Sequence, residues 1–152
     1  MEAVDDHAVP PPDMPARVLR FLETNPRRDV TFELEDGDVD AHFRVFAMRS
    51  PKFNVANFGP LQLQGGGGGR LYVEIEDMKA DVFEAVRRFV YTDETPAEVD
   101  DLLAHRRDAD RAAMLMAVKV CDLQAAADRF GLERLVLMCE KALCEAFCTK
   151  YS

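Results

Sequence analysis

The sequence predicts an α+β fold, with a small three-stranded sheet flanked by helical hairpins. Alternating apolar and polar residues, typical of strands, occur early in the chain, whereas runs at helical spacing fill its second half. The length of 152 residues suits one domain with a single core. We expect a disordered, Pro-rich leader over 1–12, an N-terminal helix within 13–28, the main domain over 29–148 and a tail over 149–152.

The charge balance argues against nucleic-acid and membrane partners. The chain carries 19 Lys and Arg against 28 Asp and Glu, which gives a formal net charge of −9. Phosphate binding requires clustered basic residues, and the short basic clusters of this chain lie beside Asp. No apolar run approaches the roughly 20 residues of a membrane helix, and the acidic N-terminus lacks an apolar signal segment. We expect a cytoplasmic and/or nuclear location.

The first helix is predicted from Asp13, as its cap, to about Thr24. Asn25-Pro26 ends it, because the residue before proline avoids helical geometry. One face of this helix is apolar and carries Met14, Val18, Leu19 and Leu22, with Phe21 beside them. Two interpretations fit that face: the helix packs on its own domain, or it packs against a partner. The spacing alone favours neither.

A β-hairpin is predicted at the start of the main domain. Apolar residues alternate with polar ones in its first strand, at Val30, Phe32 and Leu34. Asp36-Gly37 suits a tight turn. The returning strand carries Val39, Ala41 and, at its end, Phe43.

The spacing becomes helical at Arg44, so the hairpin leads directly into a helix. Ser50-Pro51 falls inside this helical pattern, which continues to Phe53. Proline lacks the N–H and clashes one turn back, so two alternatives remain. Either Ser50 caps a new helix, or the helix is kinked.

The middle of the chain contains a turn at 57–60 and five glycines at 65–69. A flexible surface loop is predicted for the glycine run, because no Lys-Ser/Thr follows it as in a phosphate-binding loop. A third strand is expected over 71–75, followed by a helix that Asp77 caps and that runs to about Tyr91.

The last part of the chain is predominantly helical. Residues 92–110 are polar and predict a long loop, with a short helical turn near 99–103. A helix over 112–130 follows, and its apolar strip is Leu115, Val118, Cys121 or Asp122, and Ala125 to Ala126. Gly131 suits a left-handed cap before a final helix over 133–148.

No catalytic motif occurs in the sequence. Asp29, His42 and Ser50 invite comparison with a catalytic triad, but Ser50 beside proline suits a helix terminus rather than an exposed nucleophile. We therefore expect a structural His42, bonded to backbone or a carboxylate, and no enzyme activity.

The four cysteines are interpreted as buried thiols of a reducing compartment: Cys121, Cys139, Cys144 and Cys148. Cys144 and Cys148 lie one helical turn apart, but no further His or Cys is placed to complete a zinc site. No metal and no other cofactor is expected.

Three segments of this sequence resemble the BTB (POZ) domain, in particular that of plant MATH-BTB proteins. They are DVTFELEDGDVDAHFRVFAMRSPKF, VEIEDMKADVFEAVRRFVYTDETP and DLQAAADRFGLERLVLMCEKALC, and they occur in the family's order. The resemblance covers about Leu19 to Cys148. The leader resembles the connector that follows a MATH domain in such proteins.

The resemblance implies a protein–protein interaction module. Domains of this class form homodimers or pair with related BTB proteins, and they bind the N-terminal region of a cullin scaffold as adaptors for substrate ubiquitination. By this resemblance the dimer interface is Val18, Leu19, Leu22, Asp29 and Val45. The cullin interface is Phe58, Leu61, Leu63 and Tyr91.

Two departures from the family pattern bear on function. Phe43 stands where the family has a basic residue, which weakens any charged pocket at the dimer interface. Leu63 stands where the cullin-binding motif has Glu, and the glycine run follows at once. An alternative is therefore a dimerisation-only protein that pairs with full-length relatives without binding cullin.

Overall fold

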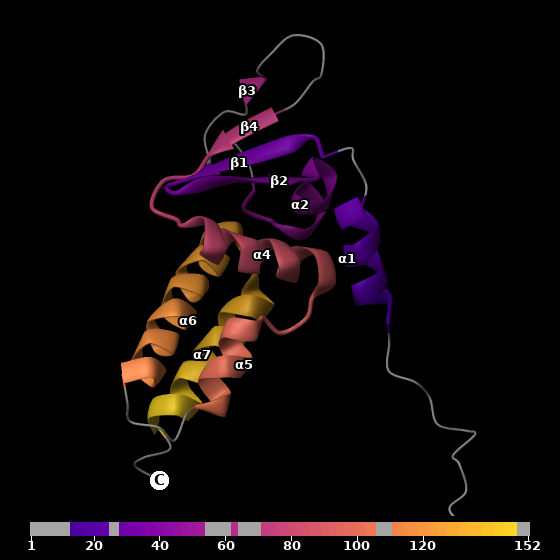
Figure 1. Ribbon diagram of the computed structural model, residues 1–152. Coiled ribbons are helices and arrows are strands. Elements are labelled where there is room, and N and C mark those ends of the chain that lie inside the picture. The colour runs from indigo at the N-terminus through magenta and orange to yellow at the C-terminus, as the bar shows by residue number, and fades with distance from the viewer. Residues whose placement is uncertain (1–12, 25–27, 54–61, 64–70, 106–110, 149–152) are drawn as a thin grey trace, which may run out of the picture.

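The computed structural model describes residues 13–24, 28–53, 62–63, 71–105 and 111–148. The predicted leader, tail, 57–60 turn and glycine run lie outside these ranges, as do Phe58 and Leu61. The described residues form a small sheet that covers one side of a helical layer, and one further helix stands beside both (Figure 1).

The described sheet has four strands in the order β2-β1-β4-β3. β1 (Val30–Leu34) pairs antiparallel with β2 (Gly37–Ala41), as the predicted hairpin requires, and parallel with β4 (Leu71–Glu74). β3 (Gln62–Leu63) adds a two-residue antiparallel edge to β4. The three predicted strands are confirmed. β3 was not predicted, because a strand of two residues is too short to show an alternating pattern.

Helix α2 (Phe43–Arg49) follows the hairpin directly, as predicted. Phe43 begins this helix, so its assignment to the returning strand was wrong. The reason is the Asp29 carboxylate, which accepts a hydrogen bond from the Phe43 N–H at 2.8 Å and caps the helix.

Ser50 marks the end of α2. The helix stops at Arg49, which excludes a kinked helix through Pro51. The Ser50 hydroxyl is buried and donates to the backbone carbonyl of Phe130. The alternative of a new helix capped by Ser50 was also wrong, because residues 51 and 52 form a turn and no helix begins there.

Helix α4 (Ala80–Thr92) begins three residues after Asp77, so the predicted cap at Asp77 was wrong. The cap comes instead from the hairpin turn, where the Asp36 carboxylate accepts a hydrogen bond from the Ala80 N–H at 2.7 Å. Asp77 lies in the connection with a left-handed backbone, φ 60°. At the other end, Asp93 takes the left-handed cap position.

The remaining helices form the layer farthest from the sheet in Figure 1: α5 (Ala97–Ala104), α6 (Arg111–Phe130) and α7 (Glu133–Cys148). The segment predicted as a loop with one helical turn is thus a complete short helix, because Val99 and Leu102 bury its inner side. Gly131 takes the predicted left-handed conformation between α6 and α7, with φ 72°.

The predicted apolar strip of α6 does not face the core. Leu115 and Val118 are 56% and 55% exposed, and Cys121, Asp122 and Ala125 are also exposed. Of the predicted strip only Ala126 is buried. The buried face carries smaller residues beside Leu123 and Phe130, namely Ala117, Val120, Ala126 and Ala127.

The core centres on four phenylalanines from four elements. The Phe32 ring of β1 lies 4.8 Å from Phe46 of α2 and 4.5 Å from Phe83 of α4, measured between ring centroids. Phe130 at the end of α6 approaches the same rings. All four are fully buried.

Helix α1 (Met14–Thr24) has the predicted bounds and lies at the side of the molecule, next to α4 (Figure 1). An exposed ion pair joins Asp13 to Arg17 at 2.9 Å. Among the described residues, no helix combines the length and apolarity needed to span a membrane.

The Asp36 cap yields the first prediction. Asp36→Ala removes the acceptor for the Ala80 N–H and should lower the free energy of unfolding by about 1 kcal/mol, as for other helix caps. Urea unfolding followed by circular dichroism measures this loss. Asp38→Ala, an exposed change on the adjacent strand, is the control and should cost less. Equal losses in both variants would contradict the cap.

Candidate functional site

An apolar groove opens between helices α1, α2 and the end of α4. It has a volume of about 330 Å³. Its walls are Met14 and Val18 of α1, Val45, Met48 and Arg49 of α2, and residues 90–93 at the C-terminal end of α4. Met14 and Met48 are 64% and 77% exposed, so the apolar surface continues beyond the groove itself.

Two of the predicted dimer-interface residues meet in this groove. Val18 and Val45 belong to different helices, are both half-buried and both line the groove. Leu19 and Leu22 lie in α1, but their side chains are outside the described part of the structure. Asp29 is exposed beside α2 and serves within the chain as its cap.

Ion pairs with two arginines connect the rim of the groove to the helical layer. The Asp93 carboxylate is 2.8 Å from Arg49 and 2.8 Å from Arg134, through different oxygens. Burial raises the pKa of Asp93, but hydrogen bonds and charges from the two arginines outweigh it, so the net shift is downward. Asp93 thereby joins α2, α4 and α7 around the groove.

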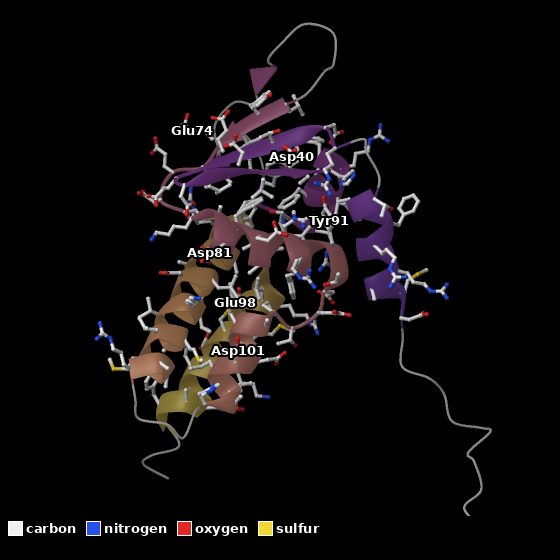
Figure 2. The ribbon with its side chains drawn as sticks, viewed as in Figure 1. Asp40, Glu74, Asp81, Tyr91, Glu98 and Asp101 are labelled. Carbon is white, nitrogen blue, oxygen red and sulfur yellow. The ribbon has the colours of Figure 1, made fainter. Side chains whose placement is uncertain are left out.

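Below the hairpin, His42 and Tyr91 form a polar pair, and Tyr91 is labelled in Figure 2. The Tyr91 hydroxyl accepts a hydrogen bond from the His42 backbone N–H at 2.9 Å and lies 2.9 Å from its ring Nδ1. The expected backbone or carboxylate partner of the imidazole was therefore wrong. The Ser50 hydroxyl is bonded to Phe130, so no triad with His42 and Asp29 is assembled.

Burial shapes the ionisation of this pair. Burial lowers the pKa of His42, Asp29 opposes this shift, and Arg28 and Arg87 add to it. Burial raises the pKa of Tyr91, against the His42 hydrogen bond and the Arg87 charge. The buried Nε2 atom of His42 has no hydrogen-bond partner among the described residues. The charged, doubly protonated form of this imidazole is therefore disfavoured in the folded chain.

The structure does not test whether the residues predicted to contact a cullin come together, because Phe58 and Leu61 lie outside the described residues. Leu63 lies in β3 opposite Leu71, and its side chain is outside the described part. Tyr91 is 6% exposed, with its hydroxyl engaged by His42 and the Arg87 guanidinium over its ring. The cullin role of Tyr91 remains a prediction, and little of its ring is free for a contact in this structure.

The cysteines differ from the expectation of buried thiols. Cys139 is buried, and burial raises the pKa of its thiol to about 12. Cys121 and Cys144 are exposed, and the side chain of Cys148 is outside the described part. Within the described ranges, no group of three or more His, Cys, Asp or Glu is placed to hold a metal ion.

Met48 is the main groove residue that the sequence did not single out. The helical pattern counted it with Phe46 as one apolar stretch, but Phe46 faces the core and Met48 faces solvent. A helical projection places Val45, Met48 and Arg49 on a different side of the helix from Phe46. This difference is the sequence signal that could have identified Met48 as a surface residue.

The fold and the open apolar groove define a protein-interaction module. The chain matches the BTB/POZ domain model over residues 20–146, and it belongs to the BTB/POZ family. Over 90% of its length it is 31% identical to BTB/POZ and MATH domain-containing protein 6 of Arabidopsis thaliana, of which it covers 32%. It is also 36% identical over 70% of its length to mouse TD and POZ domain-containing protein 4, of which it covers 23%.

The chain thus spans a third or less of the length of these relatives. Among solved structures it is similar to the BTB domain of zebrafish PATZ1, with a TM-score of 0.51 and 14% identity. That match covers 90% of this chain and 98% of the other, and it confirms the fold.

The His42 environment predicts a pH dependence of stability. The folded state lowers the His42 pKa below the reference value of 6.5, so the unfolded chain binds this proton first. His42 therefore contributes to a loss of stability as pH falls below about 6.5. Unfolding free energies between about pH 7.5 and about pH 5.5 measure the effect.

Two variants isolate the contribution of His42. His42→Gln has no such titration, so its stability should fall less over this range than that of the wild type. His105→Gln, at the end of α5, is the matched control and should follow the wild type. Parallel curves for His42→Gln and the wild type would refute the assignment.

Proposed function

We propose that this chain is the dimeric adaptor module of a cullin-RING ubiquitin ligase, acting in the cytoplasm and/or nucleus. The observation that carries the proposal is the groove that Val18 and Val45 both line, because the family resemblance assigns both residues to the dimer surface. Membership of the BTB/POZ family supports the same role. The net charge of −9 supports a protein partner rather than a nucleic acid.

The dimer surface combines apolar side chains from two helices. Met14 and Val18 project from α1, and Val45 and Met48 project from α2. Complete burial of one such side chain is worth roughly 1.5–3 kcal/mol, so a few per chain are enough to hold a stable dimer. The partner in this proposal is a second copy or a related BTB protein.

Val18→Asp tests this dimer surface. A carboxylate in the groove would lose its hydration on association, so we expect the dissociation constant of the dimer to rise about tenfold or more. Sedimentation equilibrium of the full chain measures it. Ala16→Asp, on an exposed part of α1 outside the groove, is the control and should remain dimeric. An unchanged dimer in Val18→Asp would place the interface elsewhere.

The substitution at Leu63 keeps a second function open. In the family resemblance, Glu at this position contributes to cullin binding, and this chain has Leu. A chain that dimerises but binds no cullin would pair with full-length relatives and regulate them. Cullin binding is the property that separates the two functions.

Binding of the purified chain to the N-terminal segment of a cullin, measured by calorimetry, tests the adaptor function. Leu63→Glu restores a carboxylate worth about 1.5–3 kcal/mol as a charge-assisted hydrogen bond, so affinity should rise about tenfold or more. Gln62→Glu places the same charge one residue away and should give no comparable gain. Absence of a complex between the wild type and the cullin segment at micromolar concentration would favour the dimerisation-only function.

A further inference from the structure

Helix α6 carries a second apolar surface, distant from the groove. Figure 1 shows α6 at the outer side of the helical layer, with α5 and α7 on its other side. On the outward face, Met114 is 67% exposed and Val118 is 55% exposed, and Cys121 and Ala125 are exposed as well. Single exposed apolar residues are ordinary, but these form one continuous stripe.

The spacing of this stripe is that of a helix pair. Its positions follow the alternating three- and four-residue steps of a heptad seam: Arg111, Met114, Val118, Cys121, Ala125 and Asp128. We name these six residues the α6 seam. The opposite face of the helix is buried in the core, whereas all six residues of the seam are exposed.

The two ends of the α6 seam carry opposite charges. Arg111 lies at the N-terminal end and Asp128 at the C-terminal end. The Asp128 side chain is 75% exposed, and the Lys52 ammonium lies 3.9 Å from its carboxylate while donating to the Asp128 backbone carbonyl at 3.2 Å. A partner helix that matches this seam needs an acid opposite Arg111, a base opposite Asp128 and small apolar residues between them.

A second copy of α6, running antiparallel, meets this requirement. In one register Arg111 faces Asp128 of the second copy, Met114 faces Ala125, Val118 faces Cys121, and each pair occurs twice by symmetry. In the in-register parallel arrangement Arg111 faces Arg111 and Asp128 faces Asp128, so like charges oppose that alignment.

We propose that the α6 seam is a self-association surface, through which two copies of this chain pair their α6 helices antiparallel. One helix pair buries less than the roughly 1,200–2,000 Å² of a standard interface, so the contact is weak on its own. It is separate from the groove beside α1. In a chain that also dimerises through the groove, the α6 contact would link dimers, and paired contacts reinforce one another.

Charge reversal tests the proposed register. In Arg111→Glu alone and in Asp128→Arg alone, both end pairs become repulsive, and the dissociation constant of the α6 contact should rise about tenfold. A mixture of the two variants makes both end pairs attractive again and should restore association. Sedimentation velocity over a wide concentration range measures this. All variants are compared in the Val18→Asp background, so that association through the groove does not mask the α6 contact.

Val118→Glu provides the second test, because this exposed residue lies at the centre of the seam and its change should leave thermal unfolding unaltered. We expect loss of the α6 contact. Leu137→Glu, a 61% exposed position on α7 outside the seam, is the matched control and should associate like the parent. The proposal is overturned by a monomeric Val18→Asp parent, by association that survives Val118→Glu, or by charge variants whose mixture fails to associate.

Discussion

The contact between phenylalanine rings of four elements holds the described structure together. Phe32 of β1 packs against Phe46 of α2 and Phe83 of α4, with ring centroids 4.8 and 4.5 Å apart, and Phe130 of α6 closes the cluster. Loss of one buried ring typically costs about 3–5 kcal/mol, which is comparable to the whole stability of a small domain. The orientation of α2 relative to α4 follows from these rings, and with it the shape of the groove.

Hydrogen bonds to the backbone of Phe130 hold the same phenylalanine cluster in place. The Ser50 hydroxyl and the Lys52 N–H both donate to the carbonyl of Phe130, where α6 turns into α7. Gly131 is required at this turn for two reasons. Its φ of 72° disfavours other residues, and a Cβ there would lie 2.9 Å from Cγ of Lys52. The end of α2 is therefore tied to the corner of the helical hairpin, which connects a helix that lines the groove to the helix that carries the α6 seam.

The sequence predicts those features that depend on neighbouring residues. The hairpin, the bounds of α1 and α7, and the left-handed Gly131 all follow from local spacing. The α4 cap does not, because its acceptor Asp36 is 44 residues away from Ala80 and only the tertiary fold brings the two together. For the same reason the meeting of Val18 with Val45 is invisible to periodicity. The family resemblance supplied both residues, but not the groove they share.

Helix α6 shows a second limit of prediction from sequence. It is apolar on both sides, so its periodicity identifies a helix without stating which side is buried, and the bulkier residues Leu115 and Val118 favoured the wrong side. The core selects the smaller side because α4, α5 and α7 all contact α6, and a side chain larger than the buried Ala117, Ala126 or Ala127 would force the helices apart.

The larger apolar residues of α6 are thereby left for a partner. A chain with one two-fold contact forms a closed dimer. A chain with two different two-fold contacts can bind a further copy at each end of the assembly, and unless the two symmetry axes meet, the assembly stays open. Each chain added to such a series brings a formal charge of −9, and the accumulated repulsion limits its length. The two proposed contacts therefore have different effects. The groove joins two chains into a dimer, and the α6 seam links such dimers into short arrays whose length depends on salt.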